Sequence, residues 1–152
     1  MKKFSYSLQK ILDLRNFELD QAQMELGRVN AQIANVNNQL KAVAAQKFNA
    51  TKAADSTNDF SLHVQTQDFF IYLDQRKDAL LAELVQLEMI AEQKREVVRE
   101  AMKKVKVLEK LKEKKYEAWK NEYQHQEEIA SDDVVTSQSF QKVMSKETVT
   151  SS

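Results

Sequence analysis

The stretch LQKILDLRNFELDQAQMELGRVNAQIANVNNQLKAV, residues 8–43, decides the fold, because its apolar residues recur at alternating spacings of four and three. Ten of the eleven positions on this pattern are apolar, and the exception is Arg15. A 3.5-residue repeat kept over about five heptads is typical of a coiled coil, since an isolated helix drifts toward 3.6. The positions of this first seam are Leu8, Leu12, Arg15, Leu19, Ala22, Leu26, Val29, Ile33, Val36, Leu40 and Val43.

A second seam with the same spacing follows later in the chain, and ten of its twelve positions are apolar. The two exceptions are Lys77 and Lys94. Two such seams on one chain predict two long helices that bury one apolar stripe each. The positions of the second seam are Phe70, Leu73, Lys77, Leu80, Leu84, Leu87, Ala91, Lys94, Val98, Ala101, Val105 and Leu108.

A polar linker separates the two seams and begins with the turn and N-cap residues Asp55-Ser56-Thr57-Asn58-Asp59. We predict one helix over about 4–54, a linker over about 55–65 and a second helix over about 66–130. The second helix is expected to begin from about Phe60 with an irregular start before Thr66. Nine of the last 22 residues, from Ser131 onward, are Ser or Thr, so we expect residues 131–152 to form a disordered tail. The fold class predicted is all-α, a long antiparallel two-helix coiled-coil hairpin; the alternative is an open chain that dimerises in parallel.

Composition excludes several classes of function. The chain has no Pro, no Cys and one Gly, so it has neither Cys-ligated metal sites nor a glycine-rich phosphate loop. Its 23 basic and 23 acidic residues balance, which disfavours nucleic-acid binding. No apolar run approaches a membrane span, and Lys10 and Asp13 interrupt the N-terminus before a signal-peptide core could form. We therefore expect a soluble protein that is not an enzyme and holds no cofactor or metal.

The helix beyond the hairpin carries the most unusual segment. Ten basic and four acidic residues lie between Lys94 and Lys115, and Tyr116, Trp119 and Tyr123 then fall on one helix face. Because the first helix does not extend alongside them, these aromatic residues indicate a binding site for another protein. The alternative is that they pack on residues 1–6 or in a dimer.

A second apolar patch lies near the linker. Phe69 and Leu73 are spaced i, i+4 and are expected to present one edge together. Core packing is the alternative. His63 and His125 have no companions at metal-ligand spacing, and the carboxylates follow solvated helix faces.

Residues of both predicted helices and of the linker form a recognisable set. They are Phe4, Tyr6, Leu8-Gln9-Lys10, Leu12, Leu14-Arg15, Ala22, Leu26-Gly27 and Gln39-Leu40-Lys41 in the first helix, a polar linker, and Gln67, Phe69 and Leu73 in the second. This set resembles the flagellar export protein FliJ family, and the resemblance covers residues 1 to about 130.

The resemblance implies a long antiparallel coiled coil of the bacterial flagellar type III export apparatus, similar to the central stalk of rotary ATPases. It implies that the end of the hairpin with the termini enters the hexameric export ATPase and that the linker end reaches the cytoplasmic domain of the export gate protein FlhA. Export chaperones are further implied partners. The location implied is cytoplasmic, peripheral at the inner-membrane export apparatus.

Matching positions imply that Phe69 and Leu73, with Gln39 and Val43, contact the export gate. Gln46 and Ala50 stand where the family can carry aromatic residues. The assignment of the ATPase contact to the aromatic face of the second helix comes from the residue pattern alone. The resulting hypothesis is a non-enzymatic coupling component; the alternatives are a chaperone-escort or holdase coiled coil, or a structural dimerisation rod.

Overall fold

The structure is a computed structural model that describes residues 3–150. It contains two helices, α1 (Gln9–Asp55) and α2 (Phe60–Thr150), which are 47 and 91 residues long. The chain divides into two compact units. Asp13–Val105 form what we call the hairpin unit, and Met1–Leu12 together with Lys106–Ser152 form the terminal unit.

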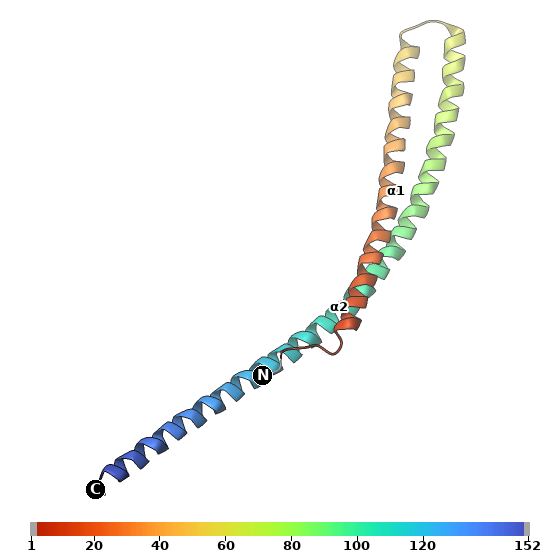
Figure 1. The fold of residues 1–152 in the computed structure, drawn as a ribbon. Coiled ribbons are helices and arrows are strands. Elements are labelled where there is room, and N and C mark those ends of the chain that lie inside the picture. The colour runs from red at the N-terminus through yellow and green to blue at the C-terminus, as the bar shows by residue number, and fades with distance from the viewer. Residues whose placement is uncertain (1–2, 151–152) are drawn as a thin grey trace. The chain divides into compact units, whose positions relative to one another are not determined.

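In the hairpin unit, α1 and the first part of α2 run side by side in opposite directions (Figure 1). The predicted all-α antiparallel hairpin is therefore confirmed. Val36, Val43, Leu73 and Leu80 form the buried core cluster, against which Leu40, Leu84 and Leu87 pack. All but one of the predicted seam positions between residues 15 and 105 are buried or half-buried, the exception being Lys77. The 3.5-residue spacing thus correctly located the interface between the helices.

The charged seam residues reach the edge of the interface. Arg15 is half-buried and its Nη1 donates to the Glu18 carboxylate at 2.9 Å, within the same helix. Lys94 is half-buried and Lys77 is exposed. Long aliphatic stems can cover an apolar stripe while their charged heads stay in water, which explains how the seam accommodates these residues.

The turn between the helices is shorter than predicted, because α2 begins at Phe60. Asp59 acts as the N-cap: its Oδ1 accepts a hydrogen bond from the Ser61 amide at 3.0 Å. The Asp59 carbonyl accepts from the His63 amide at 3.1 Å, which is the first hydrogen bond of the helix ladder. The cap allows the helix to start at once, so the expected irregular segment up to residue 65 is absent from this turn.

The seam also extends further toward the turn than its predicted limit at Val43. Ala50 is half-buried and Ala54 is 7% exposed on α1, while Leu62 and Thr66 are half-buried on α2. Small and polar side chains occupy most of these positions, so they do not stand out as an apolar repeat. The two helices nevertheless remain packed up to the turn.

At its other end, α2 continues past Ala130 to Thr150, through the segment for which we expected disorder. No Gly or Pro lies in this segment, so nothing in the backbone forces the helix to end. Every side chain from 131 to 147 is exposed. An isolated helix without packing is marginal in water, so disorder of this segment in solution stays a prediction.

Candidate interaction sites

Three rings stack along α2 in the terminal unit and form what we call the aromatic cluster with a fourth ring from the N-terminal segment. The Tyr116 and Trp119 rings lie 5.8 Å apart at 29°, and those of Trp119 and Tyr123 lie 5.5 Å apart at 34°. Their spacing of three and four residues places them on one helix face, as predicted. Trp119 and Tyr123 are half-buried, whereas Tyr116 is 43% exposed.

The fourth ring belongs to Phe4, which lies in the non-helical segment before α1. Its centroid is 5.2 Å from the Tyr116 ring, in an edge-on arrangement at 81°, and 5.8 Å from the Trp119 ring. The Tyr6 hydroxyl donates a hydrogen bond to the Leu108 carbonyl at 3.1 Å. The structure therefore provides the intramolecular partner that the sequence analysis considered as the alternative, namely packing on residues 1–6.

Charge near the aromatic cluster changes sign along the helix. The basic stretch up to Lys115 comes before the cluster, and acidic residues follow it. A hydrogen bond with the Glu127 side chain, reinforced by the negative charge of that carboxylate, raises the pKa of the Tyr123 hydroxyl above its usual 10.0. The cluster is therefore a neutral aromatic surface between a basic and an acidic segment.

At the turn end of the hairpin unit, the structure separates the residues expected to contact the export gate. Leu73 is 0% exposed and Val43 is 5% exposed, because both lie in the core between the helices. Phe69 is 38% exposed and stacks on Tyr72, with centroids 6.3 Å apart. Phe69 and Leu73 therefore do not present one edge together; the exposed ring beside Phe69 is Tyr72, which is 55% exposed.

Gln39, the remaining residue assigned to the gate contact, is half-buried on α1. Its Oε1 accepts a long hydrogen bond, 3.5 Å, from Arg76 Nη2 on α2. This contact joins the two helices next to the exposed Tyr72. Of the four assigned residues, Phe69 and Gln39 thus have surface that another protein could touch, while Leu73 and Val43 hold the helices together.

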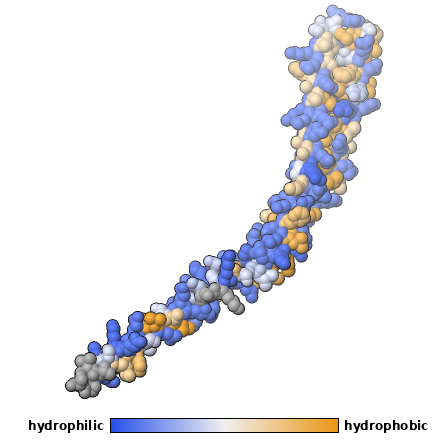
Figure 2. Space-filling model, viewed as in Figure 1, coloured by the Kyte–Doolittle hydropathy of each residue, from blue (hydrophilic) through white to orange (hydrophobic). Residues whose placement is uncertain are grey.

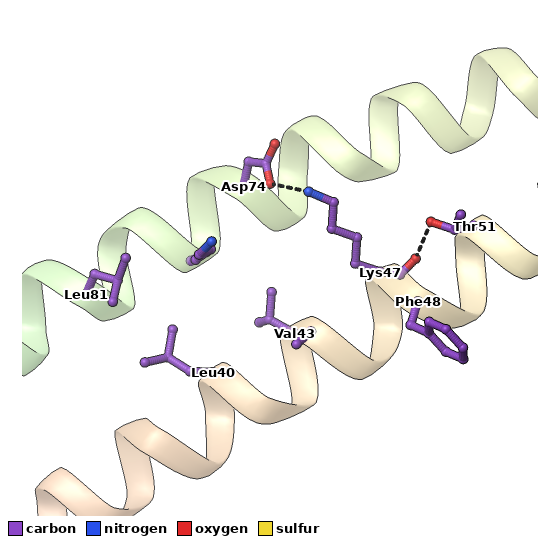
Figure 3. Close-up of a pocket in the computed structure, with 9 residues that line it drawn as sticks. Leu40, Val43, Lys47, Phe48, Thr51, Asp74 and Leu81 are labelled. Carbon is purple, nitrogen blue, oxygen red and sulfur yellow. Dashed lines mark hydrogen bonds and ion pairs between the residues drawn. The ribbon is translucent and has the colours of Figure 1, made fainter.

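A groove of about 540 Å³ lies on the hairpin unit, which sequence reasoning did not find. Lys47 reaches from α1 to Asp74 on α2, with Nζ 3.2 Å from Oδ1 (Figure 3). The same Nζ lies 5.8 Å from the Phe70 ring centroid. Phe48 points away from α2 in the same view. The lining residues are Leu40, Val43, Ala44, Lys47, Phe48, Thr51, Asp74, Lys77 and Leu81.

Exposed apolar side chains are not confined to this groove. Figure 2 shows apolar and hydrophilic residues interleaved along the hairpin unit. Phe60 and Phe48 are the most exposed rings of this unit, at 80% and 62%. Such side chains offer contact surface to other proteins, although scattered ones are common on protein surfaces.

Neither histidine lies in an arrangement suited to proton transfer or metal binding. His63 Nε2 lies 3.0 Å from the Thr57 carbonyl at the turn, and His125 is exposed on α2. Within residues 3–150, no three His, Asp or Glu side chains gather closely enough to hold a metal ion. Over the same range, neither helix is apolar enough over sufficient length to cross a bilayer.

These features define an all-α protein built on an antiparallel two-helix coiled coil, with an aromatic cluster on the longer helix. The sequence model of the family described as "Flagellar FliJ protein" matches residues 4–144. The chain therefore belongs to the FliJ family and is a component of flagellar type III protein export. A search of curated proteins and a search of solved structures each gave no match.

Proposed function

We propose that this chain is a non-enzymatic coupling component that binds the hexameric flagellar export ATPase and the cytoplasmic domain of the export gate protein FlhA. Membership of the FliJ family supports a role in export. The ATPase contact is assigned to Tyr116, Trp119 and Tyr123. The observation that carries this assignment is the stacking of three aromatic rings on a part of α2 that no second long helix covers.

Aromatic side chains support the assignment because they supply large contact area at low cost in conformational entropy. Trp and Tyr are enriched among residues that dominate binding energy in protein interfaces. The rings of this cluster are already ordered by stacking on one another, so little further ordering is needed when a partner binds. A single helix is also narrow, about 10–12 Å across with its side chains, which suits insertion into a protein ring.

The gate contact is assigned to the turn end of the hairpin unit, where Phe69 and Gln39 touch the partner. Leu73 and Val43 act there as positioning residues, since both are buried between the helices. Tyr72 joins the contact because its ring stacks on Phe69 and is more exposed. This assignment retains the four residues implied by family resemblance and divides them by accessibility.

The ATPase assignment is tested by titrating the export ATPase with the protein and measuring nucleotide hydrolysis. We expect stimulation that saturates at about one chain per hexamer, and a marked loss of stimulation for Trp119→Ala. Phe140→Ala is the matched control, since that ring also lies on α2 and is 65% exposed. Equal stimulation by all three proteins would contradict the assignment of Trp119, and a flat titration with assembled ATPase rings would contradict the ATPase role.

The gate assignment is tested by calorimetric titration of the FlhA cytoplasmic domain. We expect Phe69→Ala and Tyr72→Ala to weaken binding while leaving ATPase stimulation unchanged. Phe60→Ala is the matched control, because Phe60 is an exposed ring at the same end that no ring contact joins to Phe69. Unchanged binding of both variants, with helicity intact by circular dichroism, would remove Phe69 and Tyr72 from the contact.

An escort role toward export chaperones is a second candidate, and the groove on the hairpin unit favours it. Its lining combines apolar side chains such as Leu81, 41% exposed, with the charged residues Lys47 and Asp74. Helix-in-groove recognition uses such a combination. Leu81→Glu should weaken chaperone binding without changing ATPase stimulation; equal binding by both proteins would argue against the groove.

A further inference from the structure

We propose that residues 3–8 form a strap that competes with the export ATPase for the aromatic cluster and is released when the ATPase binds. This proposal rests on the assignment of the ATPase contact to that cluster. The strap is the non-helical segment before α1, and Phe4 and Tyr6 are the side chains that fasten it to α2.

The strap covers part of the cluster and leaves part accessible. Phe4 packs on Tyr116 and Trp119, whereas Tyr123 stacks only on Trp119 among the ring contacts of the described residues. Tyr116 is nevertheless 43% exposed. A partner can therefore make its first contact at Tyr116 and Tyr123, and it must displace Phe4 to reach the part of Trp119 that Phe4 covers.

Conformational entropy opposes the fastening of the strap. Among residues 3–150, the strap is held by the hydrogen bond from the Tyr6 hydroxyl to the Leu108 carbonyl and by the contacts of the Phe4 ring with Tyr116 and Trp119. Tyr6 and Phe4 are both half-buried, so neither side chain is enclosed. Ordering a non-helical backbone segment costs conformational entropy at every residue, and this cost favours the open state.

The release point is built into the start of α1. The Gln9 amide donates to the Tyr6 carbonyl at 3.0 Å and the Leu12 amide donates to the Leu8 carbonyl at 2.9 Å. The first bond ties the strap to α1, and the second belongs to the first turn of the helix. Rotation of the backbone near residue 7 would therefore lift Phe4 and Tyr6 together, with loss of the first bond, while the turn that begins at Leu8 stays closed.

Trp119 makes this opening measurable, because it is the chain's single tryptophan and lies directly against Phe4. In full-length Phe4→Ala, we expect greater quenching of Trp119 fluorescence by acrylamide than in the wild type. Tyr6→Phe removes only the hydroxyl, and we expect a smaller rise in quenching. Phe140→Ala should leave the quenching unchanged, since no contact of that ring with the cluster is present among the described ring pairs.

The competition is measured by titrating the same proteins against the export ATPase. A strap open about one tenth of the time reduces apparent affinity about tenfold, so Phe4→Ala is expected to tighten binding by up to about tenfold. Tyr6→Phe should tighten it less, which gives a graded series.

Three outcomes would overturn the proposal. Unchanged quenching in Phe4→Ala would show that Phe4 does not cover Trp119 in solution. Increased quenching with weaker ATPase binding would show that Phe4 belongs to the binding surface and does not compete with it. If wild type and variants alike fail to bind assembled ATPase, the proposed function fails and the competition fails with it, while the quenching series still decides separately whether the strap is closed.

Discussion

The hairpin unit and the terminal unit share the helix α2, yet different interactions hold them. In the hairpin unit, buried apolar side chains from two helices meet, and Leu73 and Ala91 have no exposed surface at all. On α2 beyond Val105, every described side chain up to residue 147 is half-buried or exposed. The same helix therefore contributes fully buried side chains in the hairpin unit. In the terminal unit its own side chains are at most half-buried, and the buried side chain there is Leu12 of α1.

Helical backbone and stable structure are therefore separate properties of this chain. A helix can run through residues 131–150 because nothing breaks it, but only packing supplies a large free energy of unfolding. Where burial is absent, the chain remains available for binding. The part of α2 in the hairpin unit thus contributes to stability, whereas the part in the terminal unit leaves its side chains accessible.

The largest expected difference between the units is in amide hydrogen exchange. We expect backbone amides near Val36 and Leu73 to exchange about a thousandfold or more slowly than those between residues 131 and 147, because only the former need the hairpin to unfold. Mass-spectrometric exchange on the full chain measures this contrast. Comparable protection in both segments would mean that packing absent from this structure holds the last part of α2.

Truncating the most buried leucine should have the largest effect on stability. Leu73→Ala is expected to lower the free energy of unfolding by about 2–5 kcal/mol, because it removes methyl groups from a closed core. Leu81→Ala, at a leucine 41% exposed, is the matched control and should cost much less. Urea denaturation followed by circular dichroism gives both values. Equal costs would contradict the placement of Leu73 in the core and Leu81 outside it.

Replacing the single glycine should change stability in the opposite direction. Gly27 is exposed in the middle of α1, and a Cβ built there meets no atom within 4 Å. Gly27→Ala is therefore expected to raise the free energy of unfolding of the hairpin unit by about 1 kcal/mol. The same denaturation experiment measures it. A loss of stability would indicate that the glycine is required by a contact that the hairpin unit does not show.

The smallest effect that we expect is electrostatic, and it concerns the pKa of Glu92 in the hairpin unit. Hydrogen bonds from Arg95, at 2.6 Å, and Arg99, at 2.8 Å, lower the pKa of the Glu92 carboxyl below its usual 4.5. A carboxyl whose pKa is lowered on folding stabilises the folded state above pH 4.5, and this contribution is lost as pH falls through the folded-state pKa. The groups are exposed, so solvent and salt screen the effect.

Carbon-detected magnetic resonance of the glutamate side chains tests the Glu92 prediction. We expect its titration midpoint below 4.5 at low salt, and a return toward 4.5 in the Arg95→Gln, Arg99→Gln double variant. A midpoint at or above 4.5 in the wild type would contradict the pairing. Tyr123 of the terminal unit provides the opposite case, since its hydroxyl is expected to titrate above 10.0 and to return toward it in Glu127→Gln.

The sequence predicted the hairpin because burial between two helices imposes a repeat that can be counted. Seam residues such as Val36, Leu73 and Leu80 follow it and are buried. The start of α2 near Phe60 could also be predicted, since Asp59 followed by an apolar residue is a helix-start signal. The irregular start expected before residue 66 is not observed, because α2 is regular from Phe60 onward.

The contacts of the candidate sites were harder to predict. Phe4 packs on residues more than a hundred positions away, and no periodicity in a non-helical segment indicates which ring it meets. The burial of Leu73 could have been inferred, because it lies on the seam and Phe69 does not. The groove around Lys47 depends on how side chains of two helices fill the space between them, which spacing alone does not determine.

Gly27 also gives the two helices of the hairpin different bending stiffness. α1 contains the chain's only glycine, while α2 contains neither glycine nor proline. Glycine has no Cβ and therefore resists backbone rotation less than any other residue. The bending stiffness of α1 is for this reason expected to be lowest at Gly27. A force applied at the turn would therefore be taken up by flexing of α1 near residue 27, with α2 as the stiffer leg. Gly27→Ala would remove this difference in compliance and leave the contact surfaces of the protein as they are.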